Sequence, residues 1–363
     1  MCIAVEEVKC FTNRVFTTPR MRITNLQLSE TSSSSSSVST STSIKEKEES
    51  SRRRKRVSIL ICPAQFCVPS DYDTMIQDLQ EFFRHGNAAE SRSVELGTCR
   101  VVTLPRTEWI KVAKSLPTKE YIDGTLLTRK TVPWYYNAME DALCDILAAQ
   151  PNDDDDDDKK TNSICIIGHS IGGWIARGYL GGLSYSSTAI HRKVVQKPGM
   201  VSSFITLGTP HSSPTTALVD QTRGLLREVE ETVQCSSSYL VNNRGIQVTN
   251  VCSASVQGKL LSTNVEELVA AASYIPLLGL PSSSANVIKG DGIVPLSLGL
   301  MDQPANHVIL ERSEACGNLI RHASVIPTPW NLIDAYAKSI PLPEDFLWYG
   351  SKNVLPQWAK YIQ

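Results

Sequence analysis

One stretch of the chain reads Asn162-Ser163-Ile164-Cys165-Ile166-Ile167 and continues as Gly168-His169-Ser170-Ile171-Gly172. Its first six residues form a short segment that is mostly apolar and rich in β-branched side chains. These properties are typical of a buried parallel strand. The small residues that begin Ile171–Leu180 predict a helix packed tightly under a sharp turn. A G-x-S-x-G pattern between strand and helix predicts a nucleophile elbow, in which glycines leave room around a strained serine. Ser170 is therefore the candidate nucleophile.

Strands alternate with helices on both sides of this stretch. The predicted strands are Val57–Cys62, Cys99–Leu104, Asn162–Ile167, Val201–Leu207, Gln247–Cys252 and His307–Leu310. The predicted helices are Tyr72–Phe83, Pro133–Ala149 and Ile171–Leu180. Such alternation predicts a mostly parallel sheet with helices on both faces. Together with the elbow it indicates an α/β-hydrolase fold over residues 57–363, with a cap or lid inserted at 212–286.

Composition excludes several classes of protein. Of the 363 residues, 36 are Lys or Arg and 37 are Asp or Glu, so no electrostatic attraction to nucleic acid is expected. No apolar stretch reaches the roughly 18 residues that a transmembrane helix needs. Ten cysteines without regular spacing indicate buried, reduced thiols, not a disulfide framework or a zinc site. We expect no metal and no cofactor, and we interpret the acidic run at 151–162 as a surface loop.

Residues 1–56 do not resemble part of a fold. They contain a Ser/Thr-rich run, Thr31–Ser43, and a basic cluster, Arg52–Arg56. Such a segment buries too little apolar surface to offset the entropy of ordering it. It has the composition of either a plastid transit peptide or a disordered cytoplasmic tail, and Glu6, Glu7 and Glu30 count against the transit peptide. A fluorescent fusion of residues 1–56 tests plastid targeting, which a diffuse cytosolic signal would exclude.

A serine nucleophile needs a base and an acid that orients the base. In α/β-hydrolases these follow in the order Ser, Asp or Glu, His, on loops beyond the carboxyl ends of strands. Asp291 is the acid candidate, because glycines on both sides allow a sharp loop that presents its carboxylate. Both His307 and His322 follow it. We favour His322, in the loop after the last predicted strand, over His307, which begins that strand.

The oxyanion of an ester intermediate needs two backbone N–H donors. One is expected to be the amide of Ile171, directly after the nucleophile. The other is expected from the loop after the first strand, at Gln65 or Phe66. Two further histidines, His169 in the elbow and His211, are expected to play supporting and structural roles.

Several segments, in one order along the chain, resemble lipase-type α/β-hydrolases. They are Ile61–Phe66, Ser70–Tyr72, Gly168–Trp174, Leu207–His211 and Gly290–Pro295. The resemblance is nearest to plant and algal proteins related to GPI inositol-deacylases, and Asp220–Leu226 and Trp348–Trp358 are similar to a plastid-associated branch of them. It covers the chain from Val57 onward and implies esterase or lipase-like activity with the triad Ser170, Asp291 and His322.

The chain departs from that family in two places. Its first loop reads Pro63-Ala64-Gln65-Phe66 where the family usually has Pro-Gly, and Glu311–Asn318 lengthens the path to His322. GPI inositol-deacylases are membrane-embedded, and no apolar stretch of this chain is long enough for a transmembrane helix, so GPI deacylation does not follow from the resemblance.

The expected substrate is a carboxylic ester with an acyl or lipid part. The apolar residues of Val265–Leu280 would suit an acyl chain or peripheral contact with a membrane, and they would equally suit a protein core. Acyl transfer by the same triad and a non-catalytic binding protein on the same scaffold are the alternatives.

Overall fold

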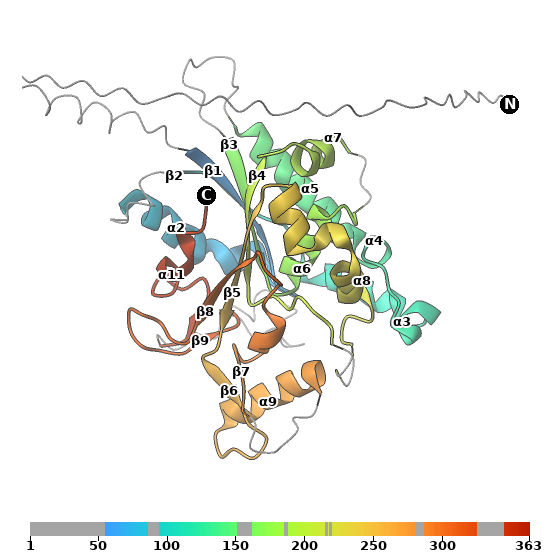
Figure 1. The fold of residues 1–363 in the computed structure, drawn as a ribbon, viewed down its shortest axis with the longest axis vertical. Coiled ribbons are helices and arrows are strands. Elements are labelled where there is room, and N and C mark those ends of the chain that lie inside the picture. The colour runs from blue at the N-terminus through green and yellow to red at the C-terminus, as the bar shows by residue number, and fades with distance from the viewer. Residues whose placement is uncertain are drawn as a thin grey trace, which may run out of the picture. The chain divides into compact units, whose positions relative to one another are not determined.

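Six strands form the central sheet of the computed structural model, in the order β2-β1-β3-β4-β5-β8 (Figure 1). The structure describes residues 55–85, 94–150, 162–184, 188–214, 217, 220–279, 287–324 and 345–363, all within one compact unit, Arg52–Gln363. The strands are β1 (Lys55–Cys62), β2 (Val94–Val101), β3 (Asn162–His169), β4 (Val201–Leu207), β5 (Gln247–Ser253) and β8 (Asn306–Leu310). Every pairing in this sheet is parallel. The predicted α/β-hydrolase fold is thereby confirmed.

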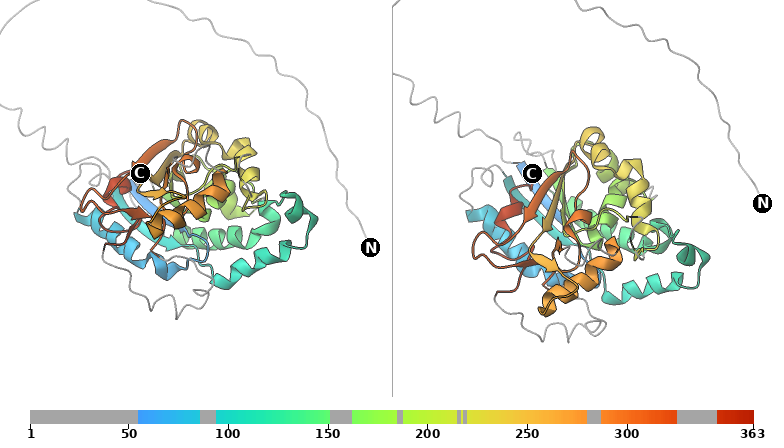
Figure 2. Two further views of the ribbon diagram at one scale, coloured as in Figure 1. Left: turned by 90° about the horizontal axis from the view of Figure 1, so that it is seen from below. Right: turned by 60° about the horizontal axis from the view of Figure 1, so that its bottom comes forward.

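Helices cover both faces of the sheet (Figures 1 and 2). Helices α5 (Pro133–Ala148), α6 (Ile171–Leu180), α7 (Ala189–His191) and α8 (Leu225–Glu231) lie on one face, and α2 (Asp73–His85) and α11 (Pro356–Ala359) on the other. Alternate side chains of a strand pack on opposite faces of the sheet. Leu60 belongs to the core under α5 and α6, whereas Ile59 and Ile61 belong to the core under α2 and α11. Both faces of β1 are therefore buried, which explains its unbroken apolar sequence.

Predicted and observed bounds agree best at the centre of the sheet. β4 and α6 match their predicted ranges, and β1 begins at Lys55, two residues before the predicted Val57. The range predicted for the second strand, Cys99–Leu104, is wrong, because β2 spans Val94–Val101. This strand lies at an edge and pairs only with β1, so much of it is only half-buried and its sequence lacks a continuous apolar signal.

The predicted cap region, 212–286, contains elements of different kinds. Helix α8 packs Val229 into the main core, and β5 belongs to the central sheet. After β5 the chain forms a separate small unit, in which the antiparallel pair β6 (Val256–Gly258) and β7 (Ile288–Gly290) contacts α9 (Val265–Leu278). Its own apolar cluster consists of Val256, Ala270, Tyr274 and Ile288. The unit appears in orange at the bottom of Figure 1.

Shorter elements complete the described chain. The segment Arg106–Ser115 forms 3₁₀ turns, and it is followed by α3 (Lys119–Asp123) and α4 (Thr128–Thr131). Strands β9 (Ile320–Arg321) and β10 (Leu347–Trp348) pair with each other. The predicted acidic loop lies outside the described residues except for Asn162, and so does the predicted N-terminal segment except for Lys55 and Arg56.

Candidate active site

Ser170 lies at a sharp turn between β3 and α6. Its backbone has φ 52° and ψ −127°, a conformation that a residue with a Cβ rarely adopts. The neighbouring residues must be glycines, because other backbone segments pass too close to them to leave room for a Cβ. A Cβ at Gly168 would lie 2.3 Å from the Gly173 Cα, and one at Gly172 would lie 2.3 Å from the carbonyl oxygen of Cys62. The predicted elbow is therefore present, and its glycines allow β1, β3 and α6 to meet under the serine.

The loop after β1 lies beside this elbow. Gln65 and Ile171, two of the predicted oxyanion donors, line the same cavity as Ser170. Phe66, the third, has a φ of 63°, and its ring lies 6.0 Å from that of Trp109. The loop is held because Cys67 N–H donates to the Ala64 carbonyl at 3.1 Å. A strained residue in this loop, as at Ser170, is typical of a functional site.

Asp291 is buried and accepts four hydrogen bonds. Oδ1 accepts from the backbone N–H of Ile293 at 3.0 Å and of Val294 at 2.7 Å. Oδ2 accepts from His322 Nδ1 at 2.8 Å and from the Tyr349 hydroxyl at 2.8 Å. Burial by itself would raise the pKa of Asp291, but His322 and these hydrogen bonds outweigh it and hold the pKa below its ordinary value. The side chain is therefore an ionised carboxylate.

His322 is the histidine that the structure pairs with Asp291. Because the carboxylate can only accept, Nδ1 of His322 carries the proton, and Nε2 is left as the proton acceptor. The His322 N–H also donates to the Asp291 carbonyl at 3.0 Å, so main chain and ring are both fixed. His307 lies elsewhere, with its Nε2 donating to the Met301 carbonyl at 2.7 Å. The structure thus brings Asp291 together with His322 and not with His307.

His169 connects the base to the loop after β1. Its Nε2 donates to the His322 carbonyl at 2.8 Å, and its Nδ1 accepts from the Tyr72 hydroxyl at 2.8 Å. That hydroxyl in turn accepts from the Ala64 N–H at 2.9 Å. The rings of His169 and His322 lie 5.2 Å apart, which places the base next to the elbow. His169 therefore has the supporting position expected of it, and its partner Tyr72 was not predicted.

The burial of His169 has a consequence for stability. Burial and, less strongly, His322 lower the pKa of His169 from 6.5 to about 3. The unfolded chain binds a proton at this residue near its ordinary pKa, and the folded chain does not, so the stabilisation is complete above that pKa and is lost as the pH falls toward 3. In His169→Gln, whose amide can still donate to the His322 carbonyl, we expect the loss of unfolding free energy between pH 6.5 and 4.5 to be smaller than in the wild type, by about 1.4 kcal/mol per pH unit. Urea unfolding at several pH values measures it, and equal slopes in the two proteins would contradict it.

His211 has a structural environment. Its Nε2 lies 3.0 Å from the Thr206 hydroxyl and 3.2 Å from Nδ2 of Asn250, and its carbonyl accepts from Arg177 at 2.9 Å. Burial lowers its pKa well below the ordinary value. It holds the loop after β4 onto α6 and β5, as the sequence predicted.

The backbone at Gly208 passes close to both the acid and the base. Its φ is +54°, and a Cβ there would lie 2.6 Å from Asp291 Oδ2 and 3.0 Å from His322 Nδ1. No local sequence pattern indicates this role, because the contact depends on how β4 and the Asp291 loop meet.

Gly208→Ala is therefore expected to displace the Asp291–His322 pair and to lower kcat for an ester by about 100-fold, since ångström-scale misplacement has that cost. A matched control is Gly182→Ala, because Gly182 has a φ of +85° and no neighbouring atom within 4 Å of an added Cβ. The control carries only backbone strain, about 1–2 kcal/mol, and should keep its activity. Equal kcat values in the two folded variants would contradict the packing role of Gly208.

Two cavities adjoin the site. The larger, about 250 Å³, is lined by Ser170, Ile171 and Trp174, and by further apolar side chains that include Leu225, Leu226 and Leu277. The smaller, about 150 Å³, is lined by Asp291, His322 and Arg321. Ile293 lines both. Two adjoining cavities, one lined by the candidate nucleophile and the other by the candidate base, can hold the two halves of an ester.

Two further classes of site were searched for in the described part of the chain. No group of three or more His, Cys, Asp or Glu side chains there could hold a metal ion. Among the same residues no helix has the length and apolarity to cross a membrane.

Comparison with known proteins agrees with the fold. The family described as PGAP1-like alpha/beta domain, which belongs with the GPI inositol deacylases, matches residues 123–281. The matched segment includes Ser170 and its elbow and ends before Asp291. The chain is related to lipase-like α/β-hydrolases. A comparison with curated proteins gave no match. The relationship supports a hydrolase at a coarse level, and plant or plastid specificity stays a prediction.

Proposed function

We propose that the protein is a serine hydrolase that cleaves a carboxylic ester of an acyl or lipid substrate. Ser170 would attack the carbonyl carbon, His322 Nε2 would take the hydroxyl proton, and Asp291 would stabilise the resulting imidazolium. The observation that supports this most is the 2.8 Å hydrogen bond from His322 Nδ1 to a buried Asp291 carboxylate, in a structure whose His169, the neighbour of the strained Ser170, donates to the His322 carbonyl. A histidine oriented by a carboxylate in this way can act as the base for a serine nucleophile.

The remaining steps follow from the same groups. The backbone N–H of Ile171 and that of Gln65 or Phe66 would bind the oxyanion, and each such donor is worth about 3 kcal/mol of the barrier in hydrolases where it was removed. His322 would then protonate the leaving alcohol, which yields an acyl-enzyme on Ser170. Water would attack the acyl-enzyme with His322 again as base.

Purified protein and a series of p-nitrophenyl esters of increasing acyl length test the proposal. We expect saturable release of p-nitrophenol and an acyl-enzyme detectable by mass spectrometry. Methanol added as an acceptor separates hydrolysis from acyl transfer, because transfer yields the methyl ester. Neither turnover nor an acyl-enzyme from any ester, with folded protein, would favour a non-catalytic binding protein.

An exposed apolar face supports a lipid substrate. Val265, Leu268 and Val269 on α9 are exposed at 72%, 38% and 57%, and Val269 borders the smaller cavity beside His322. This face would allow peripheral contact with a membrane through the cap region. Co-sedimentation with phosphatidylcholine vesicles tests this contact, and equal sedimentation of the wild type and Val269→Glu would argue against it.

A further inference from the structure

A strained arginine forms part of the larger cavity. Arg223 has a φ of 52°, and the other described residues besides glycine with positive φ are Phe66 and Ser170. Those two lie in the candidate oxyanion loop and at the candidate nucleophile. A turn that needed only this backbone conformation would be better served by glycine. The side chain of Arg223 is therefore the feature that requires an explanation.

The turn around Arg223 is built to hold that conformation. Asp220 Oδ1 accepts from the N–H and the hydroxyl of Thr222 at 2.9 and 2.7 Å, and Oδ2 accepts from the Gly224 N–H at 2.8 Å. The Arg223 carbonyl accepts from the Leu126 N–H at 2.9 Å, which ties the turn to the segment after α3. Hydrogen bonds made by four residues of the turn before α8, and one from Leu126 outside it, thus fix where the Arg223 side chain begins.

The guanidinium of Arg223 lies on an aromatic ring that lines the same cavity. Its central carbon is 4.8 Å from the centroid of the Tyr121 ring, and both residues line the cavity that contains Ser170. The acid of this turn is already occupied, because Asp220 accepts three hydrogen bonds and Arg227 lies 3.6 Å from its Oδ2. Within the described ranges no carboxylate forms an ion pair with Arg223. Stacking uses one face of the guanidinium and leaves its N–H edges able to donate.

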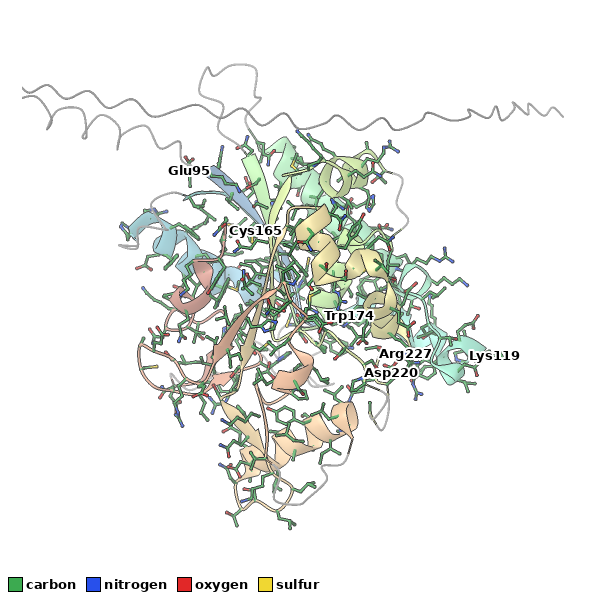
Figure 3. All side chains as sticks on the ribbon, viewed as in Figure 1. Glu95, Lys119, Cys165, Trp174, Asp220 and Arg227 are labelled. Carbon is green, nitrogen blue, oxygen red and sulfur yellow. The ribbon has the colours of Figure 1, made fainter. Side chains whose placement is uncertain are left out.

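The chemistry of the site indicates which half of the substrate enters this cavity. His322 must protonate the leaving alcohol, so the alcohol belongs on the His322 side, where the smaller cavity lies. The acyl half then occupies the larger cavity, lined by Ser170 and Trp174. In Figure 3, Asp220 and Arg227 lie on the α3 side of Trp174, where Lys119 is labelled. The turn that begins at Asp220 therefore lies toward α3 and away from the central sheet.

We propose that Arg223 binds an anionic group, a carboxylate or a phosphate, carried by the acyl half of the substrate. This inference rests on the proposed function and adds to it a charge requirement. A guanidinium fork matches a carboxylate or phosphate with two parallel hydrogen bonds, and its stacking on Tyr121 orients the fork beforehand. The apolar walls of the cavity strengthen the pairing, because they limit competition by water.

Matched esters test the charge requirement. The p-nitrophenyl half ester of suberic acid carries a terminal carboxylate, p-nitrophenyl octanoate is its neutral counterpart, and an ester with a terminal phosphate compares the two anions. In the wild type we expect kcat/KM to favour an anionic ester. In Arg223→Gln the ratio of anionic to neutral kcat/KM should fall by about 10- to 100-fold, mainly through KM, as hydrogen bonds to charged groups imply. Arg223→Lys should recover part of the ratio, and Arg84→Gln, which changes an exposed arginine on α2 on the other face of the sheet, should keep it.

The outcomes separate the two proposals. Turnover of the octanoate with no anion preference, or a preference unchanged in Arg223→Gln, would overturn the role of Arg223 and leave the ester hydrolase intact. Failure to turn over any of the esters would count against the hydrolase itself. Calorimetric affinities for the suberate half ester and for the octanoate in Ser170→Ala, with and without Arg223→Gln, test Arg223 without turnover. Equal affinity ratios there would overturn it as well.

Discussion

Ser170→Ala is expected to lower kcat for a p-nitrophenyl ester by about a million-fold, to the level set by binding and the oxyanion donors alone. The residue would supply the atom that bonds to the carbonyl carbon. Among the residues that line the larger cavity, Ser170 is the one hydroxyl that directly follows β3. The substitution removes one oxygen and keeps the Cβ. The backbone strain at φ 52° is therefore the same in the variant as in the wild type. Release of p-nitrophenol gives kcat, and thermal unfolding of the same sample shows that the variant is folded.

A matched control keeps this prediction specific. Ser212 and Ser213 also line the larger cavity, after β4, and have no role in the proposed chemistry. Ser213→Ala is expected to keep kcat within about threefold, because the hydrogen bond from Ser213 to Glu230 is made by its backbone N–H, which alanine retains. Retention of more than a few per cent of the wild-type activity in folded Ser170→Ala would contradict the nucleophile assignment.

Asp291→Asn is expected to lower kcat by about 10,000-fold, the loss seen when a triad carboxylate becomes an amide. The carboxylate accepts from four donors, two on each oxygen. An asparagine presents one accepting oxygen and one donating NH₂ group. If the NH₂ faces His322 it meets the Nδ1 proton and the Tyr349 hydroxyl, and if it faces the loop it meets two backbone N–H groups. In either orientation the asparagine NH₂ group faces other hydrogen-bond donors, unless His322 changes its tautomer.

Tyr349→Phe is the control for Asp291→Asn, because it removes one donor and keeps the charge. Its hydroxyl donates to Asp291 Oδ2 and accepts from the Ser253 N–H at 2.8 Å. We expect a loss in kcat of about 10- to 100-fold, well below that of Asp291→Asn, since one hydrogen bond to a charged group is worth about 1.5–3 kcal/mol. Rates measured from pH 5 to 9 in both variants separate the effects. Equal losses in the two would show that the hydroxyl, not the negative charge, is what His322 requires.

The sequence predicted the parts of the site that local patterns encode. The elbow was recognisable because a β-branched strand, G-x-S-x-G and a helix follow one another without a gap. Asp291 lies in the predicted loop because its flanking glycines permit the turn, and Gly292 has a φ of +98°. β4, with a buried strand on each side, was predicted at its observed bounds, Val201–Leu207.

The unpredicted parts depend on contacts between residues far apart in the chain. Tyr72 and His169 are 97 residues apart, and Tyr349 and Asp291 are 58 apart. A single tyrosine carries no local pattern that announces such a partner. In the sequence, Tyr72 only begins a predicted helix and ends a segment of the family resemblance, and Tyr349 only lies within another such segment. Gly208 could not be predicted, because a side chain is excluded there by Asp291 and Tyr349, which are distant in the chain. A turn pattern in the sequence does not reveal this contact.

The α9 segment shows why apolar sequence alone was ambiguous. Its buried residues, Ala270 and Tyr274 among them, form a small core with β6 and β7, while Val265 and Val269 are exposed and Leu277 lines the larger cavity. One helix therefore serves a core, a surface and a cavity. Hydrophobicity predicts burial but does not specify which of these surfaces a side chain meets.

Covalent labelling of the purified protein by a fluorophosphonate probe tests an activated Ser170 most directly, with the modified peptide located by mass spectrometry. The probe should label the wild type at Ser170, fail to label Ser170→Ala and His322→Ala, and label His307→Ala at the wild-type rate. Absence of labelling in the folded wild type, or labelling that persists in Ser170→Ala, would contradict the proposed serine hydrolase.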